Sequence, residues 1–312
     1  MTTIAHIISP FKGKPGSEIS IVQPITFESM KKAKDYAANS VDVELVSVQF
    51  PEDRSIVPNY FSITPDLNRS ILDIGSFQGQ RKLPLLKDIL DSLYEHSNAD
   101  YFVFTNSDIG LMPQFYMAVN DMINSGLDAF IINRRRVSKK YTSTDQLNQI
   151  YSETGEMHNG YDCFVFKREL YEQFSLGEVC LGIPHVGNTL AHNLFCWSTN
   201  FQLFTHKHLT FHIGMELVKN WGDRPLLKHN YSSFRNVLND LTPNLKIENM
   251  PGAGYSFFKR QFKWLMNPTL HYPTMLKLDL KQWRVKRKKP NRIDSGQRYY
   301  EWLQKRVKLE EE

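Results

Sequence analysis

A short polar segment at the end of an apolar run has the clearest potential for chemistry. Residues 101–104 are large and apolar, and the chain then turns polar at Asn106, Ser107 and Asp108. In open α/β sheets, ligands bind beyond the carboxyl ends of the strands. Pro113 predicts that the next helix begins too far along the chain for Asp108 to cap it. We therefore interpret Asp108 as a functional residue.

The side-chain oxygens of Asn106 and Asp108 suit a divalent cation. Mg²⁺ or Mn²⁺ that bridges two phosphates keeps several waters and takes few ligands from the protein. The segment resembles the DxD region of GT-A-type glycosyltransferases, with Asn106 in place of the first aspartate. The order of apolar segments over residues 3–215 also resembles that fold.

This resemblance implies an α/β fold of the GT-A-like, Rossmann-related kind, in which helices flank a mostly parallel sheet and the second half is mixed. It implies transfer of a sugar from a nucleotide-diphosphate donor to a glycan or lipid-linked acceptor. Mn²⁺ or Mg²⁺ would be held by Asp108 and Asn106. A histidine late in the domain often completes such a site, and His212 has that position; His208 would share its face on an extended strand.

The resemblance also implies an acceptor side. Asp162 precedes an apolar run at residues 163–166, where enzymes of this fold present acceptor-side residues. An inverting transfer needs a carboxylate within hydrogen-bond reach of the acceptor hydroxyl. We expect Asp162 to be this general base, with Glu178 as the reserve candidate and His158 as a further acceptor-side residue.

On the donor side, the loop Ser9-Pro10-Phe11 resembles the one that holds the nucleotide base in this fold. Ser107 belongs to the donor-binding motif. Arginines bind diphosphates bidentately, and we expect this of Arg81 and of Arg134 or Arg135. A solvated charge run is the alternative for the Arg134–Arg136 triplet.

The elements that must position these residues follow from the periodicity of apolar residues. Strands are predicted at residues 4–8, 41–50, 101–104, 128–133, 161–166, 201–204 and 209–213. Helices are predicted at residues 24–39, 83–96, 113–125 and 184–197, and residues 138–156 are predicted to be a loop. Alternation of strands and helices in the first half indicates a largely parallel sheet.

Composition sets the class of protein. The 312 residues are 41% hydrophobic and 23% charged, which is typical of a globular chain and excludes wholesale disorder. Neither a membrane-spanning run nor a signal peptide is apparent, and three cysteines without a CxxC pair argue against a disulfide scaffold. We expect a cytoplasmic protein with a transferase domain at 1–250, divided into a nucleotide-binding half (1–136) and an acceptor half (137–250).

The remaining residues, 251–312, are predicted to form a basic helical extension. Residues 259–308 hold 15 Lys and Arg against 3 Asp and Glu, together with several aromatic side chains. Such a mixture suits peripheral contact with the anionic inner face of a membrane, or acceptor docking. It would also suit nucleic acid, but no RNA-binding motif accompanies it.

Two alternatives remain open at this point. Sugar-nucleotide nucleotidyltransferases share a similar sheet, and the segment from Phe11 to Gly16 loosely resembles their glycine-rich loop. A non-catalytic module with a decayed motif, recorded by Asn106, is the other alternative.

Overall fold

A seven-stranded sheet in the order β3-β2-β1-β4-β9-β6-β10 is the centre of the computed structural model, which describes residues 1–77, 81–158, 160–214 and 224–288. All neighbouring strands are parallel except β9, which runs antiparallel to β4 and β6. The strands are β1 (Thr3–Ile8), β2 (Asp42–Ser47), β3 (Ser62–Ile63), β4 (Tyr101–Thr105), β6 (Ala129–Ile132), β9 (Cys163–Lys167) and β10 (Phe201–Phe204). The expected α/β fold, with helices flanking a mostly parallel sheet, is confirmed.

A small second sheet connects the segments that follow β4 and β6. Its order is β5-β11-β7-β8, from β5 (Gly110–Leu111), β11 (Thr210–Ile213), β7 (Arg135–Val137) and β8 (Glu156–Met157). Phe211 pairs with Gly110 on one side of β11 and with Arg135 on the other. This pairing carries His212 to the polar end of β4.

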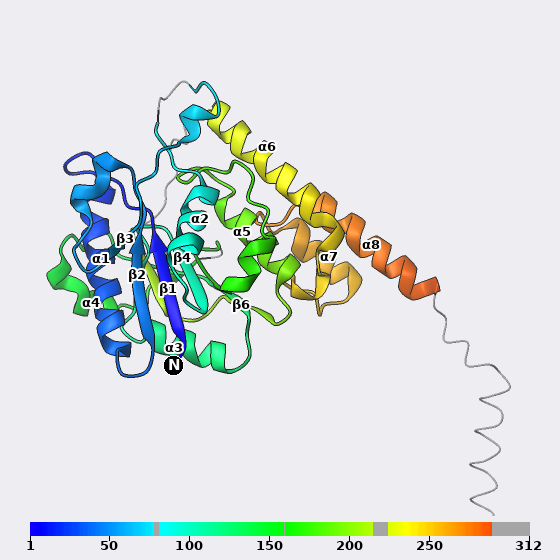
Figure 1. Ribbon diagram of the computed structural model, residues 1–312. Helices are drawn as coiled ribbons and strands as arrows, with labels where there is room; N and C mark the ends of the chain where they lie inside the picture. Colours follow the sequence, from blue (N-terminus) through cyan, green and yellow to red (C-terminus); the bar gives the residue numbers. More distant parts are fainter. Residues whose placement is uncertain (78–80, 159, 215–223, 289–312) are drawn as a thin grey trace, which may run out of the picture. The chain divides into compact units, whose positions relative to one another are not determined.

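Helices cover both faces of the large sheet. They are α1 (Glu18–Ala37), α2 (Leu86–His96), α3 (Phe115–Asn124), α4 (Leu147–Ser152), α5 (Val186–Trp197) and α6 (Arg224–Leu241), with 3₁₀ turns at Pro51–Ile56, Ile71–Asp73, Thr144–Gln146, Arg168–Gln173, Thr242–Asn244 and Ile247–Asn249. Met30 of α1 and Val119 of α3 share one core cluster with Val103 of β4. Successive strand residues point to opposite faces, and Figure 1 shows α2 and α5 away from α1, with β1 and β2 between them.

Most of the predicted strands and helices are confirmed with shifted ends, but two predictions are wrong. The first helix begins at Glu18, so Pro24 lies inside it and not at its start. Proline there removes one backbone donor, and burial of Val22 and Ile25 in a second apolar cluster offsets the loss. Residues 138–156, predicted to be a loop, contain α4, because the side chains of Leu147 and Ile150 join the same cluster.

The chain divides into two compact units, Met1–Gly254 and Tyr255–Glu312. The second contains α7 (Phe257–Leu265) and α8 (Tyr272–Lys288), joined by an ion pair between Arg260 and Asp279 at 2.8 Å. Within the described residues, no helix has the length and apolarity of a membrane span. The basic tail predicted beyond α8, at 289–312, lies outside the described residues.

Candidate functional site

A pocket of about 650 Å³ lies where β1, β2 and β4 end. It is lined by residues that directly follow β1 and β4, and by others that follow β2. Seven of the predicted site residues line it, namely Pro10, Phe11, Arg81, Asn106, Ser107, Asp108 and His212. The carboxyl edge of the sheet therefore gathers the predicted metal-binding residues and part of the predicted donor side in one cavity.

The carboxylate of Asp108 meets the imidazole of His212 in the wall of this pocket. His212 Nε2 lies 3.3 Å from Asp108 Oδ2, and the two side chains are 6% and 31% exposed respectively. The other oxygen, Oδ1, is buried without a hydrogen-bond partner in the described structure. Burial raises the pKa of Asp108, but the hydrogen bond from His212 and the positive charges of His212 and Arg134 outweigh it, so that the pKa is lowered. Asp108 is thus an ionised acceptor at neutral pH.

His212 is oriented by its own strand. Its Nδ1 lies 3.4 Å from the carbonyl oxygen of Gly214, which directs Nε2 toward the pocket. The prediction that His208 lies on the same strand face as His212 is wrong, because β11 begins only at Thr210. Nε2 of His208 is buried without a partner in the described structure, and burial followed by the charge of Arg135 lowers the pKa of this imidazole.

The loop after β1 is held by two side chains that the sequence reading missed. Gln23 of α1 accepts a hydrogen bond from the Phe11 amide at 3.0 Å, and its own amide donates to the Phe11 carbonyl at 2.9 Å. Asp53 accepts from the Lys12 amide at 2.7 Å. These bonds hold the backbone, while the ring of Phe11 stays 50% exposed at the pocket. Gln23 had no sequence signal, whereas Asp53 follows the second predicted strand closely.

Both signs of charge line the pocket. Arg81, Lys12 and Lys82 are the cations, but Lys82 is engaged with Glu52 at 2.7 Å and lies 4.0 Å over the ring of Phe50. Arg81 and Lys12 are therefore the cations better placed to meet an anionic ligand. Glu18, at the start of α1, also lines the cavity, and the sequence reading missed it.

Two predicted site residues pair with each other instead. Arg134 and Asp162 form an ion pair in which the side chains are 3% and 7% exposed, and His158 Nδ1 lies 3.2 Å from Asp162 Oδ2. Neither member of the ion pair belongs to the described lining of the pocket. β9 runs antiparallel to β6, so the start of β9 lies beside the end of β6. Asp162, directly before β9, therefore meets Arg134, the second residue after β6.

Arg135 and Glu178 also lie outside the described lining of the pocket. Arg135 belongs to β7 and donates from Nη1 to the Gly155 carbonyl at 3.3 Å. Glu178 is an exposed residue whose carbonyl oxygen lies 2.9 Å from His229 Nε2. In the described structure, no contact supports the predicted role of Arg135 at the diphosphate or that of Glu178 as the reserve base.

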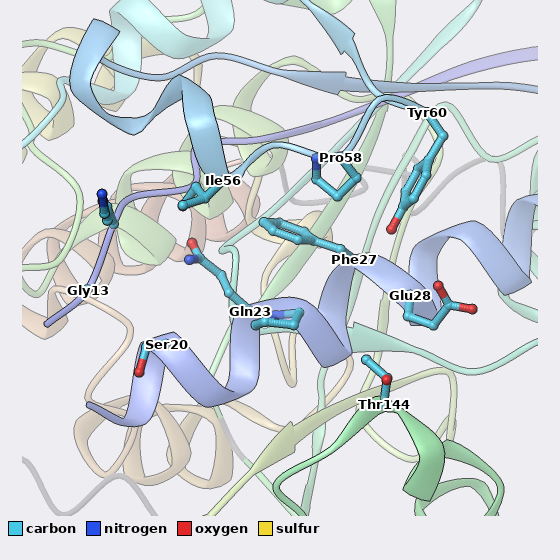
Figure 2. A pocket seen from close by; sticks show the side chains of 11 residues that line it. Gly13, Ser20, Gln23, Phe27, Glu28, Ile56, Pro58, Tyr60 and Thr144 are labelled. Atoms are coloured by element: carbon cyan, nitrogen blue, oxygen red, sulfur yellow. The ribbon is translucent and has the colours of Figure 1, made fainter. Parts of the chain in front are cut away.

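A second pocket, of about 380 Å³, adjoins the first and shares Lys12 with it. Figure 2 shows the rings of Phe27 and Tyr60 and the ring of Pro58 around this mainly apolar space. Burial, with a smaller effect of the charge of Glu28, raises the pKa of Tyr60 to about 12, so its hydroxyl is protonated at neutral pH.

The donor atoms at the first pocket fit a divalent cation that also binds substrate oxygens. Within the described residues, no three His, Cys, Asp or Glu side chains gather as metal ligands. Asp108 and His212 could supply one carboxylate and one imidazole, and Asn106 of the same segment as Asp108 could supply an amide oxygen. Mg²⁺ and Mn²⁺ sites that use few protein ligands complete their coordination with waters and phosphates.

Comparison with known proteins gives structural similarity only. No protein-family model and no curated protein sequence matches the chain. Among solved structures, S. aureus TarS in complex with UDP-GlcNAc is 11% identical, with a TM-score of 0.49, over 80% of this chain and 68% of that one.

Two further matches are more distant in TM-score. Glucosyl-3-phosphoglycerate synthase from Mycobacterium tuberculosis, in complex with Mn²⁺, UDP and phosphoglyceric acid, is 11% identical (TM-score 0.42, 75% of this chain, 78% of that one). HddC from Yersinia pseudotuberculosis is 10% identical (TM-score 0.39, 76% and 99%). No residue role follows from similarity of this degree.

Proposed function

We propose that the protein is a glycosyltransferase that moves a sugar from a nucleotide-diphosphate donor to a glycan or lipid-linked acceptor. The observation that carries the proposal is the meeting of Asp108 and His212, from distant parts of the sequence, in the wall of one pocket at the carboxyl edge of the sheet. The same pocket contains the exposed ring of Phe11 and the cation Arg81. An aromatic face, cations and an ionised carboxylate are what a nucleoside, a diphosphate and its metal require.

Each part of the donor has a partner of suitable chemistry. The held loop presents Phe11 for stacking on a nucleobase. The guanidinium of Arg81 can bind the diphosphate bidentately, and Lys12 adds a second positive charge. Asp108, Asn106 and His212 would hold Mn²⁺ or Mg²⁺, which supplies neutralisation of the charge that develops on the departing diphosphate.

The predicted general base, Asp162, remains part of the proposal as a prediction. Its carboxylate accepts hydrogen bonds from the Arg134 side chain and lies against His158. If it is the base, replacing Asp162 with Asn suppresses transfer and leaves donor binding intact. If it positions Arg134 instead, the same replacement lowers stability.

The first experiment is thermal unfolding with a panel of nucleoside diphosphates and their sugars, each with and without Mn²⁺. A ligand at about 100 times its Kd stabilises the folded state by about 2.7 kcal/mol. For a domain of this size, that shifts the midpoint by about 5–10 °C. We expect one nucleotide to give a shift that needs the metal, and Asp108→Ala to abolish it. Asp121→Asn, an exposed carboxylate on α3, is the matched control and should keep the shift.

A transfer assay with the nucleotide sugar found in this way then identifies the reaction. Release of the nucleoside diphosphate with sugar transfer supports the proposal. Transfer at the wild-type rate by Asp108→Ala would refute it. Pyrophosphate release from a sugar phosphate and a nucleoside triphosphate would identify a nucleotidyltransferase, and failure of every nucleotide to bind would favour a non-catalytic module.

A further inference from the structure

Helix α7 and its C-cap residue carry four large apolar side chains on one solvent-exposed side. Phe258, Phe262, Leu265 and Met266 are 85%, 63%, 58% and 66% exposed, although apolar side chains of this size are usually buried in globular proteins. Their spacing of four, three and one residues places them on one helical face about 100° wide. We call these four residues the α7 apolar face.

The opposite side of α7 is fastened to α8. Gln261 and Trp264 are buried, and Asp279 of α8 accepts hydrogen bonds from the Arg260 guanidinium and from Gln261. The helix therefore has a packed side held by a buried carboxylate and a separate side that stays in solvent. Packing within this unit fixes which side is which.

Two lysines border one edge of the α7 apolar face. Lys259 and Lys263 are exposed, and at about 100° per residue they fall about 20° and about 60° beyond Met266 around the helix. No acidic residue occurs in α7. Lysine stems can lie along an apolar surface while the ammonium groups reach phosphates.

We propose that α7 docks on an anionic lipid surface, lying parallel to it with the α7 apolar face inserted at the headgroup boundary and Lys259 and Lys263 at the lipid phosphates. A helix of nine residues is about 14 Å long, which is too short to cross a bilayer but suits an interfacial position. Aromatic and aliphatic side chains combined with lysines are the composition of such helices. The basic tail suggested membrane association in general, and this proposal assigns the contact to one defined helix face.

Charge favours lipid over a second copy as the occupant. Residues 259–308 carry 15 basic and 3 acidic residues, so two copies of this region would repel each other when brought together. The same charge attracts phosphatidylglycerol or phosphatidylserine. This inference does not depend on the proposed transferase activity, because α7 belongs to the second unit and the pocket to the first.

The test is co-sedimentation of the full chain with vesicles of phosphatidylcholine alone, or of equal parts phosphatidylcholine and phosphatidylglycerol. We expect binding to the anionic vesicles that weakens with salt. The double variant Phe258→Ser/Phe262→Ser should lower the partition coefficient at least about 100-fold, since each buried phenylalanine is worth about tenfold or more. Lys259→Gln/Lys263→Gln should lower it about 30-fold on anionic vesicles only.

Tyr36→Ser is the matched control, since Tyr36 is a 63% exposed aromatic residue on α1 and should not affect partition. Far-UV circular dichroism and the ligand-free unfolding midpoint should be unchanged in all three variants, which shows that they are folded whether or not a nucleotide binds and keeps this test separate from that of the proposed function. Wild-type protein that stays in the supernatant, or a phenylalanine variant that sediments like wild type, would overturn the proposal. So would a lipid-free dimer that this variant converts to monomer, because the occupant would then be a second copy.

Discussion

Replacing Asp162 with Asn tests the buried ion pair that the structure forms in place of a free general base. The substitution keeps the size of the side chain and removes the negative charge beside Arg134. The two side chains are 7% and 3% exposed, so water screens the pair weakly. Breaking a buried pair by removing one partner typically costs about 3–5 kcal/mol.

The lower end of that range applies here. Asparagine can still accept a hydrogen bond from the guanidinium, and the charge of Asp108 also acts on Arg134. We expect a loss of about 3 kcal/mol in the free energy of unfolding. At about 2–4 °C per kcal/mol for a domain of this size, the midpoint falls by about 6–12 °C.

Urea unfolding followed by circular dichroism at neutral pH measures the loss. Asp88→Asn is the matched control, because Asp88 pairs with Arg69 in a more solvent-exposed ion pair (side chains 17% and 44% exposed) and should cost about 0–1 kcal/mol. If Asp162→Asn costs no more than this control, the ion pair does not stabilise the fold and our reasoning is wrong. A stable variant that binds donor and no longer transfers sugar would assign the base to Asp162.

Two further predictions concern the core beside the site. Burial lowers the pKa of His6 to about 3, from an ordinary value of 6.5. Between these pH values His6 is protonated in the unfolded chain and neutral in the folded chain. The free energy of unfolding should therefore fall as the pH drops from 6.5 to 3, by about 1.4 kcal/mol per pH unit at most. His6→Gln should flatten this slope in urea titrations. Gly110→Ala would place a Cβ 2.2 Å from the ring of Phe211, and we expect it to cost about 1–3 kcal/mol and to weaken donor binding through the neighbouring His212. Gly254→Ala should change neither, because among the described residues no atom beyond its chain neighbours lies within 4 Å of the added Cβ. Equal stability of the two glycine variants would contradict the packing argument.

Local pattern was enough to predict which strand-end residues gather at the first pocket. Pro10, Phe11 and Asp108 lie directly beyond predicted strands, and parallel strands bring their carboxyl ends to one edge, so residues in such positions converge whatever the details of packing. The position of His212 could not be predicted from local pattern, because it depends on the pairing of β11 with β5 and β7. The family resemblance pointed to His212 as a site residue, and in the structure its Nε2 lies 3.3 Å from Asp108 Oδ2.

The contacts of the predicted acceptor-side residue Asp162 depended on information that no local pattern contains. The direction of β9 decides that Asp162 faces Arg134, and an apolar run reads the same whether its strand is parallel or antiparallel. Likewise, Gln23 holds Phe11 only because α1 begins before Pro24, and this start depends on apolar contacts from elsewhere in the chain.

The sequence by itself thus determined the class of fold, most of its strands and helices, and the polar strand ends that form the pocket, because these follow from apolar periodicity and from residue type. Tertiary structure alone decided which charges meet. Arg134 pairs with Asp162 because two segments distant in the chain come into contact. Phe258 and Phe262 are exposed because no segment among the described residues covers them. Burial and charge pairing are properties of the packed chain, so they appear only once strand direction and helix orientation are set.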